Sequence, residues 1–170
     1  MTIGFVGCAH TLAKDAGATD ASLTLQLGER PVIRLDAAAL RQQPAETLDV
    51  RWQRGDNAET ASFRGVPMRA LLTLLGVPAG GDLRGDWFTS VVTLVAADGY
   101  QVTFSVGELE PTLTGRRAIV AWERDGKALG GNEAPLRLVV EGDRRPSRSI
   151  RQVIAVRVTD PVRRVSAQPK

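Results

Sequence analysis

Short runs of alternating apolar and polar residues, separated by turn residues, are the feature that most constrains how this chain folds. In residues 22–27 three leucines alternate with polar partners, and residues 47–53 repeat the pattern. A period of two places alternate side chains on one face of a strand, so both segments are predicted to be half-buried strands. Residues 28–31 read Gly-Glu-Arg-Pro, which predicts a turn, with residues 32–35 returning as the hairpin partner.

The rest of the sequence adds more strands and a few short helices. Strands are expected where apolar residues cluster between turns, over 90–96, 100–104, 118–122, 136–140 and 150–158. Helices are expected where capping residues flank an apolar stripe: at 37–41 after Asp36, at 67–75 between Pro67 and Gly76, and from Ser105 with Glu108. In the last strand, Ile154, Val156 and Val158 are predicted to share one face. Residues 56–59 and 78–86 are predicted loops, and the fold class is therefore α+β.

The length of 170 residues fits one domain with tails. We predict a flexible N-terminal tail over 1–21, a domain over 22–160 and a basic C-terminal tail over 161–170. The apolar run at 3–9 is shorter than the core of a signal peptide, but Phe5-Val6-Gly7-Cys8 faintly resembles a bacterial lipoprotein cleavage site. The N-terminal residues therefore have two interpretations. They are a disordered tail, or they are the remnant of an export signal, which would imply a periplasmic location.

Composition excludes several kinds of site and partner. Cys8 and His10 are the only cysteine and histidine, which excludes an internal disulfide, a Cys-rich zinc site and a histidine metal cluster. No phosphate-loop or dinucleotide fingerprint is present, and no stretch approaches the roughly 20 apolar residues of a membrane span. Aromatic residues are 5% of the chain, and none interleaves with the arginines of residues 144–151, which disfavours nucleic acid as a partner.

The charge is distributed unevenly. Residues 1–143 hold 14 basic and 18 acidic residues, whereas residues 144–170 hold 8 basic and 1 acidic, so a net charge of +3 combines −4 with +7. The segment 141–149 carries three arginines and two serines between two predicted strands, and Arg151 follows. Guanidinium groups and hydroxyls suit a phosphate or another small anion. A solvated, charged connection between strands explains the same composition, so both interpretations stay open.

Four segments in chain order resemble one known family. They are Phe63-Arg64-Gly65-Val66-Pro67-Met68 with the leucines that follow, residues 92–104 with Ala97-Asp98-Gly99-Tyr100, residues 118–129, and Pro135-Leu136-Arg137-Leu138-Val139-Val140-Glu141-Gly142. Over about residues 22–160 the chain is similar to the oxidoreductase molybdopterin-binding domain of the sulfite-oxidase type. The resemblance implies mixed, strand-rich sheets with two or three short helices.

The same resemblance implies a cofactor and its place. In the family, molybdenum is held by a pterin dithiolene and one cysteine, and the pterin phosphate lies among basic and hydroxyl side chains, some of them after the Pro-Leu-Arg strand. The resemblance therefore implies that the cofactor-binding residues of this chain lie on that strand and in the loop after it. The candidates are Arg137, Arg144, Arg145, Ser147, Arg148, Ser149 and Arg151.

Two positions depart from the family pattern. The family cysteine lies on the strand before the Gly-Val-Pro helix, but residues 48–55 contain no cysteine, and Cys8 lies far upstream. A thiolate is the soft ligand that such a metal centre uses. The family's His-Gly-x-Pro stretch is Asn132-Glu133-Ala134-Pro135 here, so its histidine is absent. We therefore assign no catalytic residue and no metal ligand.

Three functional hypotheses follow. The first is a molybdopterin-domain protein that has lost sulfite-oxidase catalysis and binds a small anionic ligand, a cofactor or a protein partner. The second is a molybdopterin-dependent oxidoreductase with a non-cysteine metal site. The third is an interaction domain whose basic end contacts acidic partners or membrane surfaces, which predicts salt-sensitive binding without a small ligand.

Overall fold

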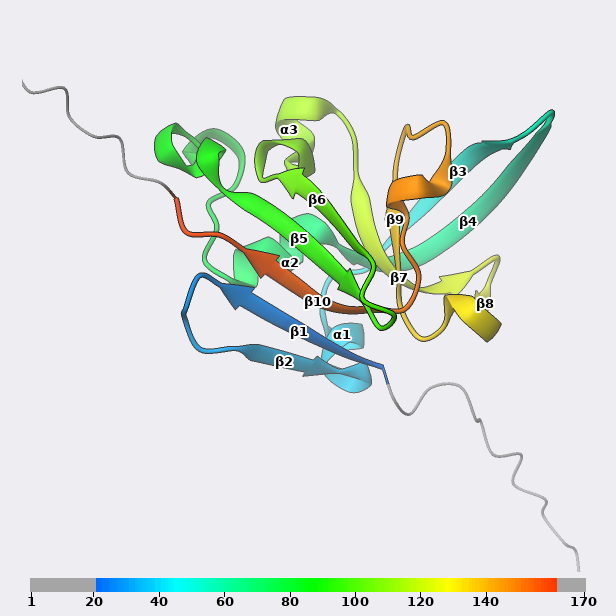
Figure 1. Cartoon of the computed structure of the whole chain (residues 1–170), viewed down its shortest axis with the longest axis horizontal. Helices are drawn as coiled ribbons and strands as arrows, with labels where there is room; N and C mark the ends of the chain where they lie inside the picture. Colours follow the sequence, from blue (N-terminus) through cyan, green and yellow to red (C-terminus); the bar gives the residue numbers. More distant parts are fainter. Residues whose placement is uncertain (1–20, 162–170) are drawn as a thin grey trace, which may run out of the picture.

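Two β-sheets face each other across one hydrophobic core in the computed structural model, which describes residues 21–161 (Figure 1). Sheet A has the order β2 (Ile33–Asp36), β1 (Ser22–Leu27), β10 (Val153–Val158), β5 (Val91–Ala96) and β6 (Gln101–Ser105). Sheet B runs from β3 (Glu46–Arg54) through β4 (Asn57–Pro67) and β7 (Ala118–Arg124) to β8 (Lys127–Ala128), and β9 (Arg137–Val140) also pairs with β7. The β1–β10 pair is parallel and every other strand pair is antiparallel.

Short helical segments connect and cover the sheets. The α-helices are α1 (Ala37–Gln42), α2 (Met68–Leu74) and α3 (Pro111–Thr114). The 3₁₀ turns are η1 (Gly80–Asp82), η2 (Gly85–Thr89), η3 (Gly107–Leu109), η4 (Gly131–Glu133) and η5 (Pro146–Arg148). In the part of the chain that the structure describes, no helix has the length and apolarity that crossing a membrane requires.

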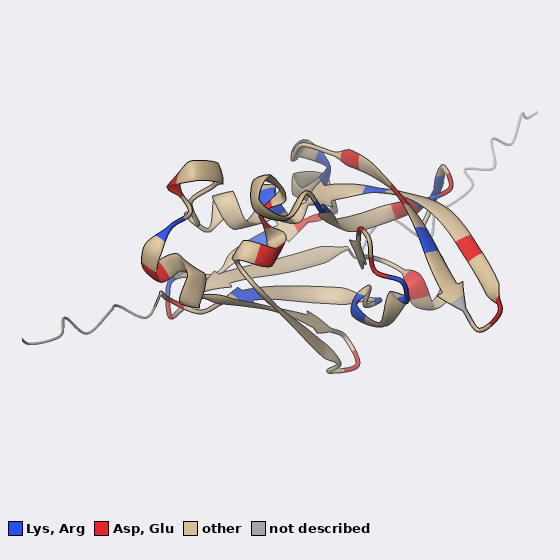
Figure 2. Cartoon of the chain, turned by 90° about the horizontal axis from the view of Figure 1, so that it is seen from above, with Lys and Arg blue, Asp and Glu red and all other residues tan. Residues whose placement is uncertain are grey.

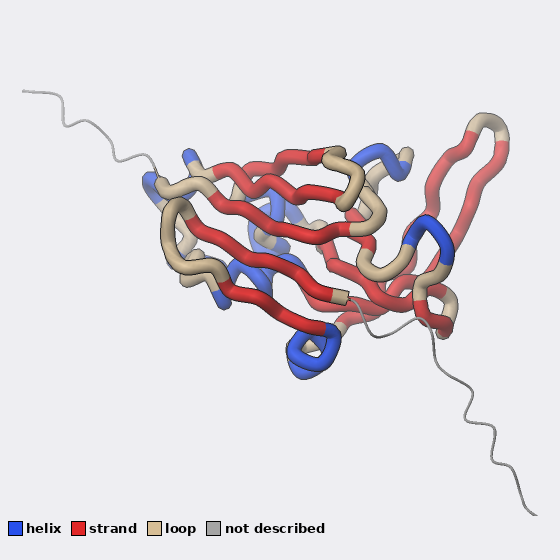
Figure 3. Tube along the Cα trace, turned by 60° about the horizontal axis from the view of Figure 1, so that its bottom comes forward, coloured by secondary structure: helices blue, strands red, loops and turns tan. Residues whose placement is uncertain are grey.

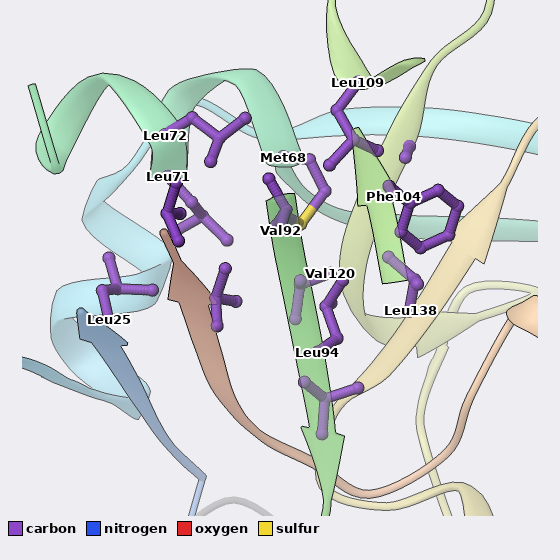
Figure 4. Packing of buried hydrophobic residues seen from close by; sticks show 14 of the residues in the cluster. Leu25, Met68, Leu71, Leu72, Val92, Leu94, Phe104, Leu109, Val120 and Leu138 are labelled. Atoms are coloured by element: carbon purple, nitrogen blue, oxygen red, sulfur yellow. The ribbon is translucent and has the colours of Figure 1, made fainter. Parts of the chain in front are cut away.

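The main core lies between the two sheets and α2 (Figure 4). Leu25 from β1 and Val92 from β5 are fully buried in it, as are Val120 from β7 and Leu138 from β9. The alternation along each strand decides which side chains enter this core. Sheet B therefore directs its other set of alternate residues to its opposite face.

That opposite face of sheet B holds a second, smaller core. Trp52 and Phe63 are fully buried there, with their ring centroids 5.6 Å apart, and Ile119, Ala121 and Val139 pack around them. Beyond this cluster the β3–β4 hairpin extends past the rest of sheet B, because residues before Phe63 pair only with β3 (Figure 3).

Local sequence signals predicted several elements correctly. The Asp36 carboxylate accepts a hydrogen bond from the Ala39 amide at 2.8 Å and caps α1. Ser105 and Glu108 form the reciprocal capping box, with bonds of 2.9 and 3.1 Å, ahead of η3. The strand-rich α+β class is also confirmed.

Other boundaries were wrong, for reasons visible in the backbone. The expected loop at 56–59 is only a two-residue turn, Gly55-Asp56, because β4 already begins at Asn57 and pairs with Arg54. The predicted last strand at 150–158 begins instead at Val153, since Gln152 has a positive φ of 51°. A register shift between Val153 and Ala155 then breaks the alternation, which leaves Ile154 43% exposed, whereas Val156 and Val158 are buried.

The two predicted tails lie almost wholly outside the described residues, and so does the export-signal hypothesis at 3–9. Within the described part, basic and acidic residues are interspersed along the ribbon (Figure 2).

Candidate functional site

The loop between β9 and β10 forms one wall of a cleft with a volume of about 340 Å³. The β9–β10 loop passes the β5–β6 turn, close to the end of β5 (Figure 1), and residues of both segments line the cleft. Its lining comes from four places in the sequence: Ala96, Asp98, Tyr100, Asn132, Arg137, Pro146, Ser147, Ser149, Ile150, Arg151 and Gln152. Four of the predicted cofactor-binding residues are therefore brought together: Arg137, Ser147, Ser149 and Arg151.

Backbone hydrogen bonds hold the loop in place. The Leu138 amide donates to the Ile150 carbonyl, and the Val153 amide donates to the Leu136 carbonyl, both at 2.9 Å. The buried Ser149 hydroxyl accepts a bond from the Val140 amide at 3.2 Å, so this serine supports the loop against β9. These contacts fix the wall of the cleft without using the charged side chains of the loop.

Arg151 is the cation that this cleft offers most directly. Its side chain is partly exposed, and no carboxylate in residues 21–161 forms an ion pair with it. Ser147 and Tyr100 lie on the rim, where the Tyr100 hydroxyl is 3.5 Å from the Ser147 carbonyl oxygen. Together with the Asn132 amide, these groups are suited to hydrogen-bond an anionic, partly planar ligand.

Arg137 lies at the buried side of the cleft. Only 1% of it is exposed, and its guanidinium carbon is 4.7 Å from the Trp52 ring centroid and 5.4 Å from that of Phe63. Burial lowers the pKa of Arg137, while the nearby Glu133 carboxylate opposes that shift. Glu133 forms an ion pair with Arg137, so this guanidinium is already paired within the protein.

The other predicted arginines are directed elsewhere. Arg148 pairs with Asp143 at 2.8 Å and with Glu108 at 3.2 Å, and it lies over the Phe104 ring. Arg148, Glu108 and Phe104 line a separate cavity of about 200 Å³. Arg144 lines a third hollow with Arg51 and Gln53. Arg145 is exposed at the start of η5.

Sequence reasoning missed several residues of the cleft. Tyr100 and Asp98 stand in the hairpin segment that carried the family resemblance, so a signal for them existed. Asn132 and Gln152 had no local signal, because only the path of the chain brings η4 and the residue before β10 to the cleft. Glu133 was noted only as a departure from the family pattern.

The lining fits an organic anion better than a thiolate-bound metal. It contains neither cysteine nor histidine, and no group of three potential metal ligands occurs in the described residues. A molybdenum centre of the kind that the resemblance implies needs a soft thiolate donor, and the lining of the cleft does not supply one. The guanidinium, amide and hydroxyl groups are instead donors for the oxygen atoms of a small anion.

Comparison with known proteins agrees with the architecture. The family model of the oxidoreductase molybdopterin binding domain matches residues 29–163. Among solved structures, the chain is similar to the sulfane dehydrogenase SoxCD from Paracoccus pantotrophus, with a TM-score of 0.66 and 16% identity. The alignment covers 85% of this chain but only 39% of the SoxCD chain. No curated protein matches in sequence.

Proposed function

Because the chain belongs to the oxidoreductase molybdopterin-binding domain family, we propose that it binds a small anionic ligand or cofactor in the cleft beside the β9–β10 loop. In this proposal it works as a ligand- or partner-binding module without sulfite-oxidase catalysis. The observation that carries the proposal is Arg151, an arginine without an ion pair in the described chain, facing a cleft of about 340 Å³.

The chemistry of the lining supports binding. A guanidinium group forms two parallel hydrogen bonds to a carboxylate, sulfonate or phosphate, and within residues 21–161 Arg151 has no ion pair that a ligand must first displace. The Ser147 hydroxyl and the Asn132 amide lie in the same lining, so they are available to other oxygen atoms of the ligand. The Tyr100 ring adds an apolar surface at the rim for an organic body.

The acids around the cleft support binding rather than turnover. The Asp98 carboxylate accepts a bond from the Tyr100 amide at 2.9 Å and so shapes the β5–β6 turn. Glu133 is paired with Arg137. Both carboxylates therefore have a structural role, and neither is assigned as a general base. A molybdenum centre would supply redox chemistry when bound, but the lining lacks its thiolate ligand, so we derive no step through it.

The decisive measurement is metal and pterin content. The full chain is purified from a host that makes molybdopterin, its molybdenum is measured by mass spectrometry, and its pterin is measured by fluorescence after oxidation. We expect less than stoichiometric molybdenum. Stoichiometric molybdenum with pterin would refute loss of the metal centre and would favour the oxidoreductase with a non-cysteine metal site.

A pair of variants tests the cleft itself. Arg151→Ala removes a guanidinium of the lining just before β10, and Arg157→Ala removes an exposed arginine within β10 that lies outside the lining. We expect Arg151→Ala to weaken binding of small oxyanions about tenfold or more, since one charge-assisted hydrogen bond is worth roughly 1.5–3 kcal/mol. Equal effects of both substitutions would show a general charge effect and contradict this location for the site.

A further inference from the structure

The buried cation of the cleft has an internal counter-ion. Arg137 is paired with Glu133, the last residue of η4, whose side chain is 14% exposed. Glu133 is also 3.3 Å from Arg124, which in turn pairs with Glu59 on β4 at 2.6 Å. The Glu133 carboxylate is therefore held from two sides, and it cannot leave Arg137 without disturbing a network that reaches the β3–β4 hairpin.

Donors remain unused next to this pair. The Nε atom of Arg137 and the Nε1 atom of Trp52 are both buried, and neither has a hydrogen-bond partner among the residues that the structure describes. The Arg137 guanidinium lies over the Trp52 ring, so these two donors belong to one cluster. Buried polar groups are normally satisfied, and each orphan donor has an energetic cost until an acceptor reaches it. Arg137 also lines the cleft, which is the side from which a ligand would come.

The formal charges at the cleft sum to zero, and Arg151 is the cation of the lining that has no ion pair within the described residues. Arg137 and Arg151 contribute two positive charges, Glu133 removes one, and Asp98 on the turn at the rim contributes a further negative charge. An ion that leaves water for such a cleft needs compensating charge close by. One unpaired guanidinium can compensate a singly charged head group, but not a doubly charged one.

We propose that Glu133 is the charge-selecting residue of this cleft: by occupying Arg137, it makes the cleft prefer singly charged anionic groups, such as carboxylates or sulfonates, over doubly charged phosphate-type groups. Removal of the Glu133 charge frees Arg137 to bind the second charge of a dianion. This inference rests on the proposed anion-binding function, and its test keeps the two separate.

The test compares two tetrahedral anions of nearly equal size. Methanesulfonate carries one charge, and methylphosphonate carries two at mildly alkaline pH. Binding of each to the full chain is followed by NMR titration of the backbone amides and of the arginine Nε–H groups. We expect the wild-type protein to bind methanesulfonate at least as tightly as methylphosphonate, with little change at the Arg137 Nε–H.

Three variants locate the effect. Glu133→Gln keeps the shape of the side chain and removes its charge, and we expect about tenfold tighter binding of methylphosphonate, with the Arg137 Nε–H now shifted on binding. Glu133→Asp keeps the charge and should retain the wild-type preference. Glu123→Gln deletes an equivalent charge on β7, outside the pair with Arg137, and should leave both affinities unchanged.

Several results would overturn the proposal. They are an unchanged preference in Glu133→Gln, the same gain in Glu123→Gln, or a gain in Glu133→Asp. If the Glu133→Gln variant does not fold without a ligand, the proposal requires that methylphosphonate restores its fold and that methanesulfonate does not, because a ligand stabilises the state that binds it. If methylphosphonate fails to restore the fold, the proposal is refuted. If anion binding depends on Arg151 but the preference for methanesulfonate over methylphosphonate is unchanged in Glu133→Gln, the proposed binding site is supported and the proposed role of Glu133 is refuted.

Discussion

Gly65→Ala is the substitution for which the structure makes the sharpest prediction of stability. Gly65 lies in β4, opposite Glu46 of β3 and Ala121 of β7, at the point where the β4–β7 register shifts. A Cβ atom added there would lie 2.1 Å from the Val120 carbonyl oxygen and 2.4 Å from the Ala121 Cα. Both neighbours are backbone atoms of a paired strand, so no side-chain rotation can relieve the clash.

The magnitude follows from what has to move. Overfilling a packed core typically costs about 1–3 kcal/mol, and a clash with backbone belongs at the upper end of that range. Replacing glycine also restricts the unfolded chain, which returns roughly 0.4–1 kcal/mol. We therefore expect a net loss of about 2–3 kcal/mol in the free energy of unfolding. For a domain of this size that lowers Tm by roughly 4–12 °C.

The assay is urea and thermal unfolding followed by circular dichroism, with Gly81→Ala as the matched control. Apart from its two chain neighbours, no described residue has an atom within 4 Å of a Cβ added at Gly81, and its φ is not positive, so its substitution should change stability by less than about 0.5 kcal/mol. Equal stability of Gly65→Ala and wild type would refute the reasoning, because it would mean that β4 and β7 separate at no cost. The prediction also gives a physical reason for the glycine before Val66-Pro67: it lets β4 approach β7 closely just ahead of α2.

Two further predictions concern the second core and the acid end of the pH range. Trp52→Ala removes a fully buried ring that packs against Arg137 and Phe63. In urea titrations it should lower the free energy of unfolding by about 3–5 kcal/mol. A loss below about 1 kcal/mol would mean that the surrounding side chains collapse into the gap. Glu141 accepts hydrogen bonds from the Arg117 side chain at 2.9 and 3.1 Å, which lowers the pKa of its carboxyl below the usual glutamate range. Because the pKa of Glu141 is lower in the folded than in the unfolded state, its ion pair with Arg117 stabilises the fold at neutral pH, and this stabilisation is lost as the pH falls below about 4. Glu141→Gln should therefore lose less stability between neutral and acid pH than the wild type. Parallel curves for the two proteins would contradict that assignment.

Elements with strong local signals were predictable, and those shaped by their partners were not. The hairpin of β1 and β2 and the cap of α1 depend on neighbouring residues, so alternation and an aspartate sufficed. The strand β4 was not predicted, although it is the longest in the described chain. Its buried residues include the small Ala61, and the register shift at Gly65 interrupts its alternation, so its place depends on pairing with both β3 and β7.

The candidate site shows the same division. The basic loop after β9 stood out in the sequence, and four of the seven predicted residues do line one cleft. Composition treats Arg148 and Arg151 alike, yet Arg148 is neutralised by Asp143 and Glu108, whereas Arg151 faces the cleft without an ion pair in the described residues. Asp143 lies five residues before Arg148 and Glu108 lies forty before it, so even a carboxylate close in sequence becomes a partner only when the folded loop turns the two side chains together.

The sequence by itself determined the strand-rich class, the main turns, the family and the loop in which to search for a ligand, because these depend on short-range patterns of residue type. Only the tertiary structure decided which charges in that loop are free. Ion pairing requires charged atoms within about 4 Å, and the folded path of η4 and of the β9–β10 loop sets those distances, even for pairs four or five residues apart in sequence. The basic end of the sequence is therefore not one uniform patch: Arg148 is paired inside the protein, Arg151 faces a cleft, and the buried Arg137 beside it is already held by Glu133.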